Sequence, residues 1–319
     1  MSDGRKLTVY LGERSRSNGG LAADALVDVY ERHGLRTSIL LRGMAGFGAK
    51  HHRHSDRLLT LSEDLALVSI AVDSEDQIER ALADVRRLDL DGRVTVESAR
   101  MPEAGIPLED DVRLSVYLGR QERIDGQPAY KVVVERLHAA GVAGATVLLG
   151  VDGTSAGVRR RARFFHANAE VPLMVLAVGA SGPVAAVLPE LPGSLITLER
   201  ARVLKRDGER LAEPEQRGEW QKLTVYASEQ AQHDGRPLYA ELLQRLRAAG
   251  AAGATSLRGF WGYHGDHEPH GDTFWQLRRR VPVVTVVVDR TERILEWFAI
   301  ADELTAATGL VTSEVVPVA

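Results

Sequence analysis

Two stretches of the chain combine glycines with basic residues in a pattern that suits anion binding. Their members are Arg42, Gly43, Gly46, Gly48, Lys50, Arg258, Gly259 and Gly262. Glycines let backbone N–H groups converge on an anion, and basic side chains add charge-assisted hydrogen bonds to phosphate or carboxylate. A Walker A loop needs lysine directly after its second glycine, so a P-loop NTPase is not expected. The pattern predicts a ligand site, with a tight strand exit and solvated arginines as the alternative.

Histidines crowd the same two regions. The first region has His51, His52 and His54, and the second has His264, His267 and His270 beside Asp266 and Glu268. Imidazoles and carboxylates in a loop can hold zinc, copper or nickel. They can equally form a solvated surface that titrates near neutral pH. A divalent-metal site at His264, His267 and His270 is therefore a second hypothesis.

Composition excludes several classes of protein. The chain has no cysteine, which rules out disulfides and thiolate chemistry and fits a reducing compartment. A net charge of −4 gives no basic field for nucleic acid. The stretch 153–157 matches the G-x-S-x-G pattern of serine hydrolases, but it does not lie at a strand-to-helix elbow of a large parallel sheet. We expect a non-enzymatic, cytoplasmic protein, because no signal segment or membrane-length apolar run is evident.

The elements that carry these loops occur three times. Leu-Thr/Ser-Val-Tyr begins at Leu7, Leu114 and Leu223, which are 107 and 109 residues apart. A repeat of this length has the size of a small domain rather than of a solenoid unit. The predicted domains span 1–100, 112–203 and 220–319, joined by polar segments that contain prolines.

Each copy has the same expected order of elements. A strand is followed by an amphipathic helix, two further strands, a second helix and a last strand, which is the βαββαβ order of ferredoxin-like α+β folds. The second helix is doubtful in copy 2, where Pro183, Pro189 and Pro192 interrupt it. The third strands, 172–178 and 281–288 among them, are apolar on both faces, so the sheet face without helices needs a partner. We expect the three bare faces to pack on one another as an intrachain pseudo-trimer.

The loop residues resemble those of domain-of-unknown-function family 190, in the PII-like superfamily. The similarity rests on Gly144-Ala145-Thr146, on Gly253-Ala254-Thr255, and on the R-G-x-x-G-aromatic stretches that start at Arg42 and Arg258. It implies ferredoxin-like domains that bind small ligands, often adenine nucleotides, in the clefts between subunits. It also implies loops that signal to a partner protein, for which a membrane channel or transporter is a candidate.

The chain departs from the PII pattern in two places. It has no clear counterpart of the glycine- and lysine-rich phosphate loop that follows strand three in PII proteins. Copy 2 has Gly150-Val151-Asp152-Gly153-Thr154 where the other copies have the arginine and the aromatic residue. We therefore expect a monomeric pseudo-trimer that binds a small anionic ligand in at least one interdomain cleft. The alternatives are a metal-binding protein and a purely structural interaction module.

The arginines give this expectation a direct test. Replacing both Arg42 and Arg258 with Ala should abolish stabilisation by an adenine nucleotide, because the charge-assisted contacts to phosphate are lost. Thermal unfolding with and without nucleotide measures it. A nucleotide-induced shift that survives the double substitution would remove these arginines from the binding site.

Overall fold

The computed structural model describes seven segments of the chain, namely residues 3–48, 65–101, 111–161, 171–192, 195–265, 268–271 and 281–319. Within them the three copies have the same order of main elements. Copy 1 contains β1 (Asp3–Gly12), α1 (Ala22–Arg32), β4 (Thr37–Arg42), β6 (Ala66–Ser74), α2 (Glu75–Arg87) and β7 (Gly92–Arg100). Copy 2 contains β8 (Asp111–Gly119), α3 (Ala129–Ala139), β11 (Gly144–Ser155), β13 (Pro172–Ala180), α4 (Ser181–Val187) and β14 (Leu195–Arg200). Copy 3 contains β17 (Trp220–Ser228), α5 (Leu238–Ala248), β20 (Ala254–Arg258), β23 (Pro282–Arg290), α6 (Thr291–Leu304) and β24 (Leu310–Val315).

The predicted βαββαβ order is thus present three times, and α+β is the fold class. The strands of copy 1 lie in the order β7-β1-β6-β4, and the equivalent orders are β14-β8-β13-β11 and β24-β17-β23-β20. All these pairings are antiparallel. The doubtful second helix of copy 2 exists but is short. Pro183 lies in the first turn of α4, which ends at Val187, and a 3₁₀ turn that contains Pro189, Leu188–Glu190, follows.

Short hairpins lie between each first strand and its helix. They pair β2 (Arg16–Ser17) with β3 (Gly20–Leu21), β9 (Arg123–Ile124) with β10 (Gln127–Pro128), and β18 (Gln232–His233) with β19 (Arg236–Pro237). Asn18, Asp125 and Asp234 adopt positive φ angles of about 50° at their turns, each followed by glycine. This Asn-Gly or Asp-Gly chemistry fixes the direction in which each helix leaves its strand.

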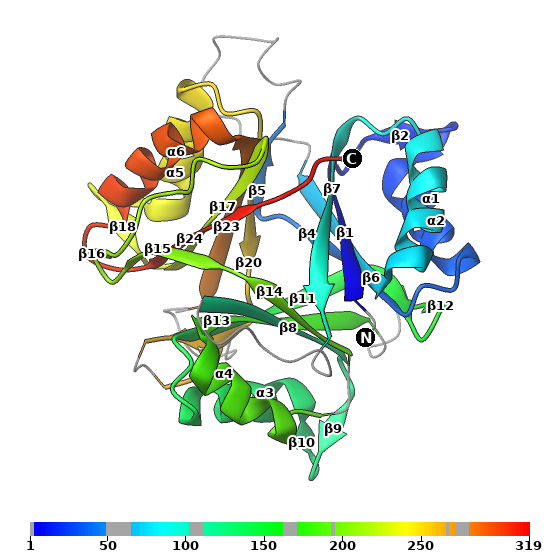
Figure 1. Ribbon diagram of the computed structural model, residues 1–319, viewed down its shortest axis with the longest axis horizontal. Helices are drawn as coiled ribbons and strands as arrows, with labels where there is room; N and C mark the ends of the chain where they lie inside the picture. Colours follow the sequence, from blue (N-terminus) through cyan, green and yellow to red (C-terminus); the bar gives the residue numbers. More distant parts are fainter. Residues whose placement is uncertain are drawn as a thin grey trace.

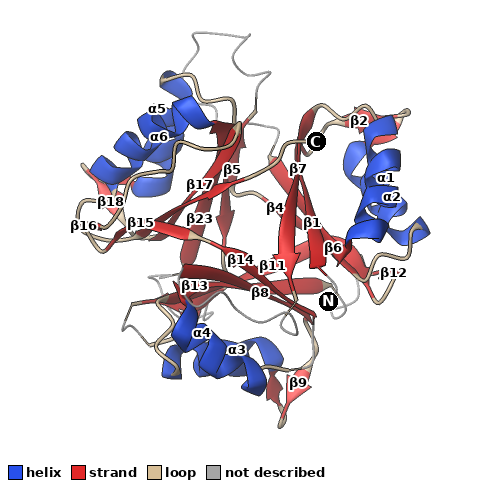
Figure 2. Cartoon of the chain, in the orientation of Figure 1, coloured by secondary structure: helices blue, strands red, loops and turns tan. Residues whose placement is uncertain are grey.

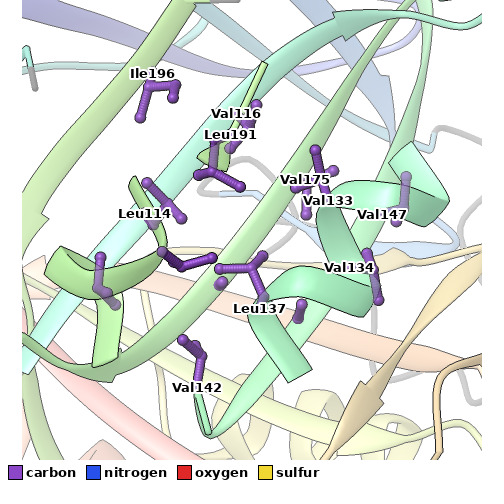
Figure 3. Packing of buried hydrophobic residues seen from close by; sticks show 14 of the residues in the cluster. Leu114, Val116, Val133, Val134, Leu137, Val142, Val147, Val175, Leu191 and Ile196 are labelled. Carbon is purple, nitrogen blue, oxygen red and sulfur yellow. The ribbon is translucent and has the colours of Figure 1, made fainter. Parts of the chain in front are cut away.

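Each helix pair covers the outer face of its own sheet. Figure 1 shows the three sheets facing one another at the centre of the molecule, and Figure 2 shows the helices at the periphery. In copy 2, Val133, Val134 and Leu137 of α3 pack onto Leu114 and Val175 of the sheet (Figure 3). Their spacing along α3 gives one apolar face, so burial of that face fixes the helix to the sheet.

The inner faces of the sheets meet in a central apolar cluster. Its members include Ile39 and Ile70 of copy 1, Met174 of copy 2, and Leu257 and Val284 of copy 3. All are at most 8% exposed. This explains why the third strands are apolar on both faces: one side meets the domain's own helices and the other meets the two neighbouring sheets.

Strands also cross from each copy to a neighbour. β5 (Ala45–Phe47) of copy 1 pairs with β20 of copy 3, and β21 (Trp261–His264) of copy 3 pairs with β11 of copy 2. The second half of β11 continues past Gly150, through a register shift, and pairs with β4 of copy 1. This strand therefore does not end at Gly150, because neighbouring backbone in copy 1 prolongs the ladder.

A second series of crossings joins the last strands. Arg100 at the end of β7 pairs with Leu198 of copy 2. β15 (Arg202–Arg206), followed by its hairpin partner β16 (Glu209–Arg210), pairs with β24 of copy 3. Val318, which follows β24, bridges to Thr95 of copy 1. Each sheet therefore receives an edge segment from another copy, which covers edges that would otherwise expose unpaired backbone groups.

Six buried charges lie where the three sheets meet, and we call them the axial charge cluster. Its bases come from the first strands and its acids from the last strands, and its members are Lys6, Arg113, Lys222, Glu97, Glu199 and Glu314. Each side chain is at most 8% exposed. Each base contacts at least two of the acids, including Lys6 to Glu97 at 3.2 Å and Lys222 to Glu314 at 3.1 Å.

Arg113 is the hub of the axial charge cluster. Its guanidinium contacts Glu199, lies 2.8 Å from Glu314 and lies 3.3 Å from Glu97, so it joins an acid from every copy. Burial alone would raise the pKa of Glu199, but the charges of Arg113 and Lys6 outweigh burial and lower that pKa to about 2. The carboxylates of Glu97 and Glu199 therefore remain ionised and paired.

The buried position of Arg113 predicts that removing its charge destabilises the chain more than removing the charge of an exposed arginine. Arg113→Met should destabilise the chain by about 3–5 kcal/mol, because it leaves buried carboxylates uncompensated. Arg87→Met is the control, since Arg87 is 78% exposed in its pair with Asp84 and should cost under about 1 kcal/mol. Urea unfolding of the two variants measures both. Equal losses would contradict the role given to Arg113.

Candidate functional site

A cavity of about 310 Å³ lies at the junction of copies 2 and 3. Copy 2 contributes the start of β11 and two residues of β13. Copy 3 contributes the end of β17, the starts of β23 and β24, and the hairpin of β21 with β22 (His270–Gly271). The lining residues are Gly144, Ala145, Thr146, Leu176, Val178, Tyr226, Ala227, Ser228, Gln230, Ala231, Tyr263, His264, His270, Pro282, Thr308 and Leu310. Cavities of this size suit small molecules.

The wall is apolar towards the centre of the molecule and polar elsewhere. Leu176, Val178 and Leu310 belong to the central apolar cluster. Ser228, Gln230 and Thr308 add neutral hydrogen-bonding groups from copy 3. An apolar wall with a few polar groups is the usual composition of a ligand pocket.

Two imidazoles line this cavity. The Nε2 atom of His264 lies 2.7 Å from the Oδ1 atom of Asp207, which orients the ring. The Nδ1 atom of His270 lies 2.7 Å from the carbonyl oxygen of Glu268. The strand registers place Gly48 of copy 1 and Ser155 of copy 2 at the positions equivalent to His264. The imidazole at this position is therefore particular to the junction of copies 2 and 3.

Tyr226 lines the inner end of the cavity and is 8% exposed. Its hydroxyl makes no hydrogen bond of normal geometry with any described residue. Burial raises the pKa of Tyr226 to about 12, with a smaller opposing effect from the Arg113 charge. The phenol is therefore protonated at neutral pH, and its hydroxyl atom is itself buried rather than open to the cavity.

The small residues at the end of β17 help to explain why the junction of copies 2 and 3 contains a cavity. Ala227 and Ser228 follow Tyr226, whereas Leu118 and Gly119 follow Tyr117 in copy 2. Arg93 takes the position of Leu310 in copy 1, and its guanidinium stacks on Trp220 of copy 3 at 4.0 Å. The three junctions therefore differ in the residues that fill them.

The two predicted binding arginines occupy equivalent ion pairs outside the cavity lining. Arg42 lies 2.8 Å from Glu13, and Arg258 makes two 2.9 Å contacts with Glu229. Copy 2 has Leu149 at the equivalent position, so it has lost this pair. Glu229 lies between the lining residues Ser228 and Gln230, which places Arg258 next to the cavity and Arg42 at a different junction.

Four of the predicted binding glycines lie at or next to β5 and β21, the strands that pair with another copy. A Cβ atom at Gly43 or Gly46 would come within 2.9 Å of a carbonyl oxygen, that of Ala66 or Ala254. A Cβ atom at Gly259 would meet Thr146, and one at Gly262 would lie 2.2 Å from the Ala145 oxygen. Close backbone approach is therefore a sufficient reason for these glycines.

The remaining predicted residues divide into two groups. Gly48 has open space around it, while Lys50, His51, His52 and His54 lie outside the described residues. His267 also lies outside them, whereas His264 and His270 meet at the cavity. No group of three His, Cys, Asp or Glu side chains is placed to hold a metal ion in the described segments.

Sequence reasoning missed the neutral polar residues of this wall and the axial charge cluster. Tyr226 belongs to the repeated Leu-Thr/Ser-Val-Tyr motif, and nothing in that motif indicates that this copy's tyrosine lines a cavity. The charges had a visible signal, because Lys6, Arg113 and Lys222 directly precede the repeated leucines Leu7, Leu114 and Leu223 inside otherwise apolar strands. A buried charge repeated in register indicates a shared polar contact among the copies.

The family model described as "Uncharacterized ACR, COG1993" (DUF190) matches residues 4–101, 111–203 and 220–318. The chain belongs to the DUF190 family. The three matches make it a tandem array of three DUF190 units. One unit is also similar to a "UPF0166 protein" of Aquifex aeolicus, with 34% identity over 95 residues that cover 28% of this chain and 90% of that protein.

Solved structures give weaker similarities. The ligand-free regulatory subunit of aspartate kinase from Thermus thermophilus aligns with 60% of this chain and 93% of its own, at a TM-score of 0.29 and 11% identity. Aspartate kinase from Synechocystis aligns with 98% of this chain and 43% of its own, at a TM-score of 0.25 and 11% identity. Neither similarity bears on the activity of the DUF190 array. None of its described helices is long and apolar enough to cross a membrane.

Two glycines distinguish packing from ligand binding. Gly262→Ala should destabilise the array by about 1–3 kcal/mol, because its Cβ atom would overpack against the Ala145 carbonyl. Gly48→Ala should change the free energy of unfolding by less than about 0.5 kcal/mol, since no atom lies within 4 Å of its Cβ position. Urea unfolding without ligand measures both. A neutral Gly262→Ala variant would contradict the packing role.

Proposed function

We propose that this DUF190 array is a PII-like signalling or adaptor protein that binds a small anionic ligand between copies 2 and 3. Its three ferredoxin-like domains act as an intrachain pseudo-trimer. The observation that carries this proposal is the cavity at the junction of copies 2 and 3, which combines an apolar inner wall with two imidazoles. Sites between domains are common locations for small ligands.

The polar groups of the cavity favour an anion over a cation. Ser228, Gln230 and Thr308 offer neutral donors, and the His264 and His270 imidazoles can add N–H donors. Among the described residues, the lining contains no Asp or Glu side chain. An adenine nucleotide meets these requirements, because its ring suits the apolar wall and its phosphate suits the imidazoles.

The position of the cavity supports a signalling output. The β21–β22 hairpin forms part of the wall and also pairs with β11 of copy 2. A ligand that contacts both copies would bias the position of this hairpin, and with it the surface offered to a partner protein. A membrane channel or transporter remains the candidate partner.

The histidines support one second candidate. His264 and His270 line the same cavity, and each is already oriented by an oxygen acceptor, as metal-binding imidazoles commonly are. A divalent metal would then be the ligand, or would accompany it. A purely structural module would bind neither.

A substitution that fills the cavity tests whether the ligand binds there. At 100 times its dissociation constant a nucleotide should stabilise the wild-type chain by about 2.7 kcal/mol, a shift of a few degrees in unfolding temperature. Ala231→Trp should remove that shift because the indole occupies the cavity that Ala231 lines. Glu122→Trp at the equivalent exposed position of copy 2 is the control and should retain it.

The unfolding temperature is measured with AMP, ATP, cyclic nucleotides and divalent metals, each with and without chelator. A shift with metal alone that chelator reverses would favour the metal-binding function. No shift with any compound would contradict both nucleotide binding and metal binding, and would favour the purely structural module.

A further inference from the structure

We propose that Arg93, Trp220 and Arg290 form a second ligand site, which binds a phosphate group at the junction of copies 1 and 3. The site is separate from the cavity between copies 2 and 3, because none of the three residues lines that cavity. It can therefore hold or fail independently of the proposed function.

These three side chains are particular to the junction of copies 1 and 3. The strand registers give the equivalent residues of the other copies, which are Leu195 and Leu310 for Arg93, Gly4 and Asp111 for Trp220, and Ser74 and Ala180 for Arg290. At the other two junctions, neither a guanidinium group nor an aromatic ring occupies these positions. Three changes at one junction have therefore brought two cations and an indole together.

Both guanidinium groups lie over one indole ring. The Cζ atom of Arg93, from copy 1, lies 4.0 Å from the centre of the Trp220 ring, and that of Arg290 lies 4.4 Å from it. Trp220 begins β17 and lies directly opposite Arg290 at the end of β23, so strand pairing positions these two side chains. A guanidinium that stacks on a ring keeps its N–H donors at its edge, where they can reach an oxyanion.

Arg93 has no acidic partner of its own. Its guanidinium makes no hydrogen bond or ion pair with any described residue, although the side chain is half-buried. Burial lowers the pKa of Arg93, and the charge of Asp289 opposes this effect only in part. Asp289 already accepts hydrogen bonds from the Ala252 N–H and the Trp297 indole. A half-buried cation without a carboxylate is costly, and a bound anion would offset that cost.

Arg290 supplies a second cation that is open to exchange. Its side chain is 50% exposed and pairs with Glu219, which is 69% exposed. Exposed ion pairs are weak because water screens them, so an incoming oxyanion can replace Glu219. The two arginines together match a phosphate group, whose charge is about −1.5 to −2 at pH 7, better than they match a singly charged carboxylate.

Copy 3 contains a matched control for the arginine. Arg293 also lies over a tryptophan ring, that of Trp297, at 4.6 Å. Its donors are already engaged by the Glu296 carboxylate and the Ala249 carbonyl. Replacing Arg293 therefore removes an arginine–tryptophan contact without removing a donor that is available to a ligand.

The experiment is calorimetric titration of the full chain with inorganic phosphate, at constant ionic strength and in a buffer without phosphate. Arg93→Leu, which introduces the leucine found in copies 2 and 3, should weaken binding about tenfold or more, because charge-assisted hydrogen bonds are lost. Arg290→Ala should also weaken it. Arg293→Leu and the cavity-filling Ala231→Trp should retain wild-type affinity. Thermal unfolding without phosphate checks that each variant is folded.

Methyl phosphate is the second probe, and it distinguishes the sources of the phosphate group. Binding as tight as that of inorganic phosphate would identify a phosphate monoester as the ligand. Exclusion of methyl phosphate would identify free phosphate. Either result supports the site, provided that Arg93→Leu weakens binding.

Four outcomes would overturn the inference. Failure of the wild-type chain to bind inorganic phosphate would reject the ligand. Wild-type affinity in Arg93→Leu would reject the residues. Equal losses of affinity in Arg93→Leu and Arg293→Leu would show a general effect of arginine–tryptophan contacts on the fold. Loss of binding in Ala231→Trp alone would place the phosphate in the cavity between copies 2 and 3, in agreement with the proposed function but not with this second site.

Discussion

The arrangement of the three copies depends on the axial charge cluster. Three bases and three acids are buried where the sheets meet. Each base contacts the acid of its own copy, and further contacts join bases and acids of different copies. Separating the copies would leave charges at the centre of an otherwise apolar surface, which is costly whether they stay buried or become hydrated next to exposed apolar residues. Pairing across copies therefore specifies the relative orientation of the inner faces. The burial of apolar surface in the surrounding cluster makes their association favourable. Arg113 has a larger part in this than Lys6 or Lys222, because a planar guanidinium can contact three carboxylates at once.

Strand exchange adds a second constraint that acts on the sites. Because β5, β21 and the end of β11 each complete the sheet of another copy, the described segment that follows strand two in each copy lies at a junction between domains. The glycines of these loops allow the backbones to approach, as at Gly46 and Gly262. A residue placed just beyond such a glycine necessarily faces a neighbouring copy. His264 is in this position, which is why a residue of copy 3 can form a site with copy 2.

The sequence was sufficient to predict the parts of the fold that repeat locally. The leucine-led first strands, the glycine-ended helices and the doubly apolar third strands gave the element order and the need to cover the inner faces. The crossings between copies were not predictable in the same way, because β5 and β21 are short and their partners lie in another repeat. The loop chemistry predicted His264 and His270, which line the cavity, and Arg258, which lies beside it, but not Tyr226 or Thr308. Those residues have no unusual local pattern, and only the packing of two copies gives them a common space.

Fusion of the three copies into one chain changes what substitution can achieve at a junction. In an assembly of identical subunits, an alanine at the exit of the first strand would alter every cleft at once. Here Ala227 alters copy 3 alone, while Leu11 and Leu118 keep the larger side chain in copies 1 and 2. Arg93 stacks on Trp220 at the junction of copies 1 and 3, and Arg159 of copy 2 pairs with Asp24 of copy 1 at 2.9 Å. The junction of copies 2 and 3 also has cross-copy contacts, such as Lys131 over the Trp261 ring at 4.3 Å, and these lie at residues outside the cavity lining. Stability and ligand binding therefore need not compete at the same residues.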